Sequence, residues 1–282
     1  MNVTKPSEAH DSPLGKRVAY RDDYASELLF PIARQGKRDE LGIRGEALPF
    51  VGEDLWNAYE LSWLNARGKP VVALGRFRFP ANSPNLVESK SLKLYLNSFN
   101  QSRMGSVDTV RTVIARDLAA AAGANVAVEV IPLSARPVRQ SDTPVGICLD
   151  ELDIDIDTYD LRPDFLRAEV GTVCETLFTH LLKSNCPVTG QPDWAMLAVC
   201  YSGPAIDRAG LLRYVVSLRR HDEFHEQCVE RIFCDILAHC RPTALAVWAR
   251  YTRRGGLDIN PFRAMPGAED GGWCDFGSEI RQ

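Results

Sequence analysis

The stretch "SVDTVRTVIARDLAAAAGANVAVEVIPL", residues 106–133, decides the fold class because a helical pattern in it leads directly into a strand pattern. Ser106 is a candidate N-cap and Gly123 closes the run as glycine does at helix C-termini, so we expect a helix between them. Residues 125–133 alternate apolar and polar side chains, which is typical of a strand. The stretch therefore predicts a helix followed by a strand.

The same order of elements occurs twice when the chain is read outward from this stretch. In the first half the patterns predict strands at 57–65 and 70–79 around a turn, helices at 89–104 and 106–123, and strands at 125–133 and 146–157. In the second half they predict strands at 168–184 and 194–203, helices at 207–220 and 222–240, and strands at 243–254 and 255–262. Sequence identity between the halves is negligible, so the repeat is architectural and the fold class is α+β.

Composition restricts the class of protein. The 282 residues are 45% hydrophobic and 25% charged, which is typical of a globular chain with one large or two moderate domains. A net charge of -4 excludes nucleic-acid binding through the overall field but permits a local basic pocket for a phosphorylated ligand. We see no apolar leader and no run of roughly 18 to 20 apolar residues, so we expect a soluble cytoplasmic protein with no membrane partner. The eight cysteines are expected to be mostly reduced, buried thiols.

The segment "SNCPVTGQPDW", residues 184–194, places Cys186 before a proline in a turn-like stretch, with Asp193 seven residues later. A thiolate is a strong nucleophile, and a nearby carboxyl group can transfer protons. The alternative interpretation is a capped strand end with an inert thiol. The local sequence leaves both open.

The segment "HDEFHEQC" begins at His221 and ends at Cys228. On a helix, His221, His225 and Cys228 would share one face and offer metal ligands. The chain has no C-x-x-C pair, so a polar substrate pocket is favoured over a metal site. Phe224, His225 and Glu226 together offer an aromatic face, a proton-transfer group and a carboxylate that can accept from an amide and an exocyclic amine together.

Two segments carry paired cations. Lys90 and Lys93 lie three residues apart at the start of a predicted helix, and Arg253 and Arg254 precede Gly255. Cationic side chains beside a glycine backbone, which has no Cβ atom, can bind phosphate closely. Taken singly, each pair is also explained as an ordinary charged turn. No G-x-G-x-x-G fingerprint is present, so a Rossmann site is not expected.

Together, "ESKSLKLYLNSFNQ", "NCPVTGQPDW", "FHE" and "RRGGLDINP" resemble the long, two-module form of the NADPH-dependent nitrile reductases of queuosine biosynthesis, the 7-cyano-7-deazaguanine reductase family. The resemblance runs from about Ser12 to Arg263. Each motif is weak alone, but their order and spacing are specific. The family has the tunnelling fold, whose module is a β-hairpin, two helices and another hairpin, with antiparallel sheets and helices on one face. The resemblance implies a flexible segment 1–15, modules at 16–157 and 158–263, a tail at 264–282, and a homodimer.

The resemblance also implies residue roles. Cys186 attacks the nitrile carbon of a cyano-deazaguanine to give a covalent thioimide, Asp193 protonates the nitrile nitrogen, and His225 donates a proton later in the reaction. The implied substrate contacts are Val87, Glu88, Ser89, Phe224, His225 and Glu226. The implied NADPH contacts are Ser89, Lys90, Lys93, Arg253, Arg254 and Gly255. Two NADPH are consumed per product, and neither a metal nor a direct nucleic-acid partner is implied.

Three other classes remain as alternatives. The first is a zinc-dependent tunnelling-fold hydrolase of the GTP cyclohydrolase type, with a Cys and a His from these segments as ligands. The second is a non-catalytic module that binds a pterin or purine through Glu226. The third is a Cys-His-Asp hydrolase, which leaves the Lys and Arg pairs unexplained.

Overall fold

The computed structural model describes residues 12–13, 15, 20–45, 47–133, 145–268 and 281–282. The chain forms two compact units that are interleaved along the sequence. The first contains 1–38, 54–138 and 253–258, and the second contains 39–53, 139–252 and 259–282. The predicted modules at 16–157 and 158–263 stay a prediction. Most of the predicted flexible segment 1–15 and of the tail 264–282 lies outside the described residues.

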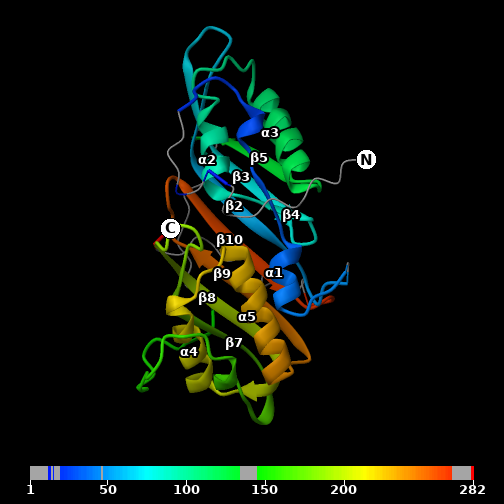
Figure 1. Cartoon of the computed structure of the whole chain (residues 1–282), viewed down its shortest axis with the longest axis vertical. Coiled ribbons are helices and arrows are strands. Elements are labelled where there is room, and N and C mark those ends of the chain that lie inside the picture. The colour runs from blue at the N-terminus through cyan, green and yellow to red at the C-terminus, as the bar shows by residue number, and fades with distance from the viewer. Residues whose placement is uncertain (1–11, 14, 16–19, 46, 134–144, 269–280) are drawn as a thin grey trace. The chain divides into compact units, whose positions relative to one another are not determined.

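The first unit is built around the hairpin that the sequence predicts. Strand β2 (Val51–Leu64) lies beside β3 (Pro70–Pro80), and β3 pairs antiparallel with β5 (Ala127–Pro132). A second small sheet pairs β1 (Pro31–Ala33) with β4 (Asn85–Val87). The remaining elements are η2 (Ser26–Leu28), α1 (Gln35–Glu40), α2 (Ser89–Asn97) and α3 (Val107–Ala122). Helix α3 packs on β4 and β5 (Figure 1).

The second unit is a mixed sheet in the order β10-β9-β8-β7-β6. Its strands are β6 (Ile147–Cys148), β7 (Ala168–Asn185), β8 (Pro192–Ile206), β9 (Ala244–Tyr251) and β10 (Leu257–Ala264), of which β10 begins in the first unit. The neighbours β7 to β10 run antiparallel, whereas β6 pairs parallel with β7. The helical elements are η4 (Pro163–Phe165), α4 (Arg208–Ser217), η5 (Leu218–Arg220) and α5 (His225–Cys240).

Strand alternation in the second unit decides which side chains meet helix α5. Met196, Ala198 and Trp248 belong to one buried cluster on the sheet. Successive side chains on a strand point to opposite faces, so odd-numbered residues of β8 and β9 point the other way. Helix α5 packs on β7, β8 and β9 (Figure 1), and Asp193 and Tyr251 reach its first residue from that face.

Most predicted elements are confirmed, including the helix that begins after Ser106 and ends at Gly123 in the left-handed conformation. The helix predicted at 89–104 is shorter than expected and ends at Asn97. Two other expectations are wrong. The strand predicted at 146–157 is reduced to Ile147–Cys148, which pairs with β7 of the second unit. His221 precedes α5 and caps η5, so it does not share a helix face with His225 and Cys228. The α+β class is confirmed. No helix among the described residues combines the length and apolar character needed to cross a bilayer.

Replacing Ser106 with Ala should lower the free energy of unfolding by about 1 kcal/mol, because the Ser106 hydroxyl accepts from the Thr109 amide at 3.1 Å and caps α3. Urea titration followed by circular dichroism measures the change. Ser106→Asp preserves an N-cap acceptor and serves as the matched control. Equal losses in both variants would contradict a capping role.

Candidate functional site

Cys186 occupies a tight loop between β7 and β8. Its amide donates to the Gln191 carbonyl at 2.9 Å, and its own carbonyl accepts from the Gly190 amide at 2.9 Å. Gly190 has a φ of 64°, a left-handed conformation that favours glycine. The Cys186 side chain is only 6% exposed. The loop therefore holds the thiol in a fixed, largely buried position at the end of a hairpin.

A short backbone bridge fixes this loop against the start of helix α5. The Asn185 amide donates to the His221 carbonyl at 2.9 Å, and the Glu223 amide donates to the Asn185 carbonyl at 3.2 Å. The Asn185 side chain also donates to Asp222 at 3.0 Å. Because Cys186 follows Asn185 and Phe224 follows Glu223, the bridge aligns the Cys186 loop with the first residues of α5.

Asp193 and His225 form a pair of groups able to transfer protons. The Asp193 carboxylate lies 3.4 Å from His225 Nε2, and the Asp193 side chain is 4% exposed. Asp193 pairs with Ser184 across the hairpin, two residues before Cys186. The His225 ring stacks on Tyr251 with centroids 3.9 Å apart and an interplanar angle of 13°. The imidazole is thus held between a carboxylate and an aromatic ring, and its Nδ1 has no hydrogen-bond partner among the described residues.

Beneath this pair lies a polar group of three fully buried side chains: Ser184, Cys228 and Tyr251. Burial raises the pKa of the Cys228 thiol to about 12, helped by the charge of Glu223, so this thiol is neutral. Burial and the neighbouring Cys228 raise the pKa of the Tyr251 phenol well above its usual value. Neutral groups at these three positions keep the floor of the site uncharged beneath Asp193 and His225.

A buried ion pair anchors the residue that precedes Phe224. The Glu223 carboxylate is 1% exposed, accepts from Arg231 Nε at 3.0 Å, and lies 3.1 Å from His221 Nε2. Burial alone would raise the pKa of Glu223, but the hydrogen bonds and charges of His221 and Arg231 outweigh it, so the pKa is lowered. Glu223 is therefore a charged anchor for the turn into α5.

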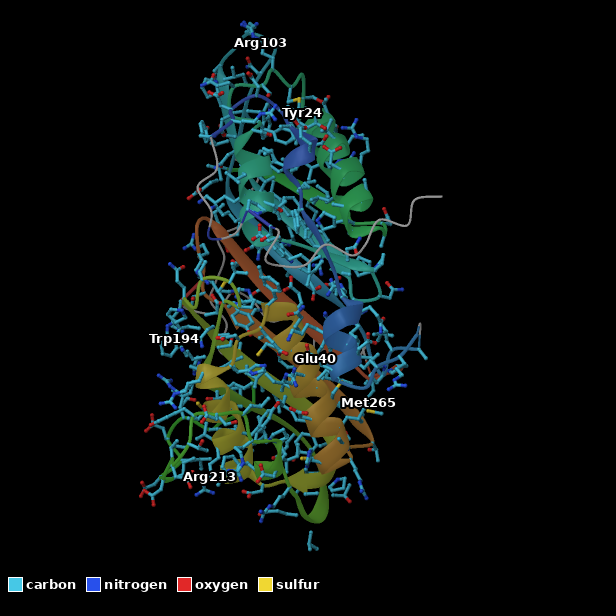
Figure 2. The ribbon with its side chains drawn as sticks, viewed as in Figure 1. Tyr24, Glu40, Arg103, Trp194, Arg213 and Met265 are labelled. Atoms are coloured by element: carbon cyan, nitrogen blue, oxygen red, sulfur yellow. The ribbon has the colours of Figure 1, made fainter. Side chains whose placement is uncertain are left out.

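The predicted substrate triplet lies at the beginning of α5. Phe224 is the N-cap, and its amide donates to the Gln227 side chain at 3.2 Å. Phe224 and His225 are half-buried, whereas Glu226 in the first turn is 2% exposed. Trp194, labelled in Figure 2, follows Asp193, is 37% exposed and has the Arg219 guanidinium 5.3 Å from its ring. The second unit thus brings Cys186, Asp193, Phe224, His225 and Glu226 to one hairpin–helix junction.

In the first unit, Glu88 serves as the N-cap of α2. Its carboxylate accepts from the amides of Lys90 at 2.6 Å and Ser91 at 2.8 Å, and the side chain is fully buried. Burial raises the pKa of Glu88, while the Lys90 and Ser91 amides oppose that rise. Val87 precedes it at the end of β4 and pairs with Pro31. The capping role went unpredicted, although an acidic residue before a helical run is the usual signal for it.

The predicted cofactor residues of the first unit come from two segments that meet at one turn. Lys93 Nζ donates to the Gly255 carbonyl and lies 3.3 Å from Glu60. Arg253 places its guanidinium over the Tyr59 ring, 4.3 Å from the centroid. Gly255 has a φ of 59°, and a Cβ there would lie 3.1 Å from Lys93 Nζ. Glycine at this position therefore lets the turn approach the helix cation closely.

Lys90 and Arg254 complete this group, with Ser89 at the start of α2. Lys90 Nζ donates to the Pro13 carbonyl at 3.1 Å, and the Ser89 hydroxyl donates to Glu88 at 3.3 Å. Arg254 pairs with Leu257 across the turn through backbone hydrogen bonds. The first unit thus collects the six predicted cofactor residues on the first two turns of α2 and on this turn.

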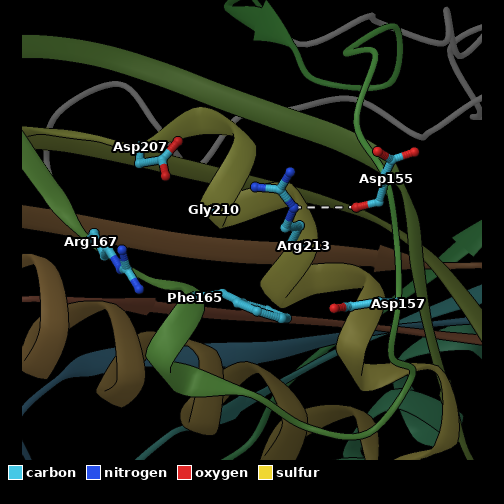
Figure 3. A pocket seen from close by; sticks show the side chains of 7 residues that line it. All are labelled: Asp155, Asp157, Phe165, Arg167, Asp207, Gly210 and Arg213. Atoms are coloured by element: carbon cyan, nitrogen blue, oxygen red, sulfur yellow. Dashed lines mark hydrogen bonds between the residues drawn. The ribbon is translucent and has the colours of Figure 1, made fainter.

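A cavity of about 350 Å³ in the second unit does not contain the candidate residues. It lies at the start of α4 and is lined by Asp155, Asp157, Phe165, Arg167, Asp207, Gly210 and Arg213 (Figure 3). Arg213 Nε donates to the Asp155 carbonyl at 3.3 Å across it. The cavity holds no cysteine or histidine, so its side chains offer neither a thiol nucleophile nor an imidazole.

The metal-hydrolase alternative required ligands from the segments around Cys186 and His225. Among the described residues, the group with at least three metal-ligating side chains in mutual reach is Cys148, Asp150 and His180, which lies in neither segment.

Sequence reasoning also missed Tyr251 and the Glu223–Arg231 pair. Tyr251 lies in a strand pattern that carries no sign of its partner on α5.

Glu223→Gln should lower the free energy of unfolding at pH 7 by about 3 kcal/mol, because it removes one charge of a buried ion pair. The lowered pKa of Glu223 means that its stabilisation is present above the unfolded-state pKa of about 4.3 and is lost as the pH falls through the folded-state value. The gap between parent and variant should therefore be constant from pH 7 to 5 and narrow in more acidic buffer. Denaturant titrations across this range measure it, with the exposed Glu169→Gln as control; a gap independent of pH down to acid unfolding would refute the assignment.

Comparison with known proteins finds one family along most of the chain. A family model described as "Nitrile reductase, 7-cyano-7-deazaguanine-reductase N-term" matches residues 20–130, and one described as "QueF-like protein" matches 192–269. A protein of Azoarcus sp. named NADPH-dependent 7-cyano-7-deazaguanine reductase is 68% identical over 97% of this chain and 96% of its own. Relatives of the same name from Aromatoleum aromaticum and Chromobacterium violaceum are 65% and 57% identical, covering 92% and 94% of this chain and 94% and 95% of their own. The chain belongs to the NADPH-dependent 7-cyano-7-deazaguanine reductase family.

Proposed function

We propose that this enzyme reduces the nitrile of 7-cyano-7-deazaguanine to an aminomethyl group, using two NADPH and a covalent thioimide on Cys186. The observation that carries the proposal is the hairpin–helix junction, where the Asn185 bridge aligns the Cys186 loop with His225 and where Asp193 lies 3.4 Å from His225 Nε2. A nucleophile, an acid and a second proton carrier are the groups that nitrile activation requires.

The first step adds the Cys186 thiol across the nitrile. Sulfur bonds to the nitrile carbon, one C–N π bond breaks, and the nitrogen takes up a proton from the Asp193 carboxyl group. The proton lost by the thiol restores the Asp193–His225 pair, so the step is balanced and neutral overall. The thioimide is more polarised than the nitrile, which makes its carbon a better hydride acceptor.

We assign recognition of the deazaguanine to residues at the start of α5 and to residues around the start of α2. Glu226 accepts from the ring amide and the exocyclic amine together, and Phe224 stacks on the ring. Val87, Glu88 and Ser89 are the further substrate contacts of the proposal. Glu88 already accepts from two amides, but a carboxylate offers about four acceptor positions, so a further donor is compatible with its cap.

NADPH supplies the two hydrides of the four-electron reduction. The residues of the first unit fit its phosphates, because Lys93 approaches Gly255 where a Cβ would intrude and Arg253 and Arg254 flank the same turn. Lys90 and Ser89 extend this cationic surface along α2. Between the two reductions an imine must be kept from water, which the buried Asp193 and Glu226 and the half-buried His225 favour. His225 donates the proton for the second reduction.

The assembly belongs to the proposal as well. Each chain carries two tunnelling-fold modules that associate through their sheets into a barrel, and two chains form a homodimer. The doubled order of strands and helices along the chain supports this arrangement. The substrate is a small molecule, and no direct contact with nucleic acid is part of the proposal.

Cys186→Ala should abolish both nitrile-dependent NADPH oxidation and the thioimide absorbance that substrate alone induces, because no sulfur remains to add to the nitrile. Cys174→Ala, which removes an exposed thiol of β7, is the control and should retain full activity. Both are measured spectrophotometrically with two NADPH expected per aminomethyl product. A Cys186→Ala enzyme that still reduces the nitrile would overturn the mechanism.

Arg254→Gln should raise the KM for NADPH by about 10–100-fold and leave the much weaker use of NADH nearly unchanged, since a charge-assisted bond to the extra phosphate is worth about 1.5–3 kcal/mol. Arg254→Lys should recover part of the loss. Initial rates with each cofactor at saturating nitrile test this. An equal effect on NADH and NADPH would show that Arg254 does not recognise the extra phosphate.

A further inference from the structure

Outside the candidate catalytic residues, three side chains of different metal-ligating types meet at the edge of the second unit's sheet. They are Cys148 on β6, Asp150 just after β6, and His180 on β7. One ligating atom from each lies within 4.8 Å of the other two. None of the three is used in the proposed reaction.

The register of the parallel pair explains why they meet. Cys148, the last residue of β6, pairs with Phe178, and Asp150 follows in the turn after it. The Asp150 carboxylate accepts from the His180 amide at 3.1 Å, which holds this turn beside His180 on β7. The fold thus brings together a thiol, a carboxylate and an imidazole from segments about 30 residues apart in sequence.

Asp150 is held rigidly in place. Its carboxylate accepts from the Thr179 hydroxyl at 2.6 Å and from the His180 amide at 3.1 Å, and it lies 2.7 Å from His180 Nδ1. One ligand of the group is therefore oriented before any ion arrives.

We propose that Cys148, Asp150 and His180 bind a divalent transition-metal ion of the zinc class, with water in the fourth position. Zinc takes thiolate, imidazole and carboxylate ligands tetrahedrally at bond lengths of about 2.0–2.3 Å, which sets ligand–ligand separations of about 3.4–3.6 Å. The group needs to rearrange by about one ångström to reach them. A thiolate and a carboxylate neutralise the ion, whereas magnesium and calcium prefer oxygen ligands alone.

Access and proton balance are consistent with this site. Cys148 is exposed, and Asp150 and His180 are half-buried, so an ion reaches the group from solvent. Binding displaces the Cys148 proton and replaces the hydrogen bond between Asp150 and His180. The ion would fasten the two-residue strand β6 to β7.

The test is metal titration of the full chain after removal of metal with a chelator, with no substrate or NADPH present. Zn²⁺ is titrated in competition with a chromogenic chelator, and Co²⁺ is used to observe thiolate-to-cobalt charge transfer. We expect one equivalent per chain. Cys148→Ser should remove the charge-transfer band, and Asp150→Asn and His180→Gln should each weaken Zn²⁺ binding by at least about 10–100-fold, the range that loss of even an outer-shell partner costs.

Matched controls separate this site from the rest of the chain. Cys174→Ser and His239→Gln remove an exposed thiol and an exposed imidazole elsewhere in the second unit and should leave binding unchanged. Cys186→Ala should also retain binding, and circular dichroism confirms that each variant folds. Absence of one-equivalent binding, or binding that survives all three ligand substitutions, would overturn the proposal. Because no nitrile is present, this outcome is independent of the reductase assay.

Discussion

The functional part of the second unit depends on the backbone bridge at Asn185. Two hydrogen bonds, from Asn185 to His221 and from Glu223 to Asn185, join the end of β7 to the chain just before α5. Backbone hydrogen bonds do not depend on which side chains follow, so the bridge sets positions without restricting chemistry. The next residue on one side is Cys186, and the next on the other is Phe224. The Cys186 loop and the start of α5 are thereby fixed relative to each other.

Side chains stabilise the bridge, although burying the Glu223 charge costs free energy that its partners must offset. Glu223 is buried with its charge, which is unfavourable unless partners replace the lost hydration. Arg231 and His221 provide those partners from the next turn of α5 and from the bridge itself. Tyr251 supports the same junction from β9 by stacking on His225. Rigid support from strands and a helix, rather than from loops, is what a proton-transfer pair needs to keep its geometry.

The sequence predicted elements well where local signals agree with tertiary packing. Ser106 and Gly123 bound α3 as expected, because capping is a local interaction between a side chain or a glycine and the adjacent backbone. The prediction failed at 146–157, where the alternating pattern produced only the two-residue strand Ile147–Cys148. A strand forms only when a partner offers hydrogen bonds, and no local pattern reports that partner. His221 was misplaced for the same reason: the Asn185 bridge, a non-local contact, draws it out of the helix.

The candidate site shows the same limit at the level of side chains. Residue type made Cys186, Asp193, His225 and Glu226 candidates, and the resemblance to the family implied their roles. Their supports were not recognisable, because Tyr251, Ser184 and Cys228 look like ordinary core residues in the sequence. Strand register brings Ser184 and Tyr251 next to Asp193 and His225, and the packing of α5 on the sheet brings Cys228 there. Cys148, Asp150 and His180 follow this rule as well, since only the parallel register of β6 on β7 makes them neighbours. Reactive groups are therefore predicted by residue type, whereas the contacts that position them follow from pairing between distant strands.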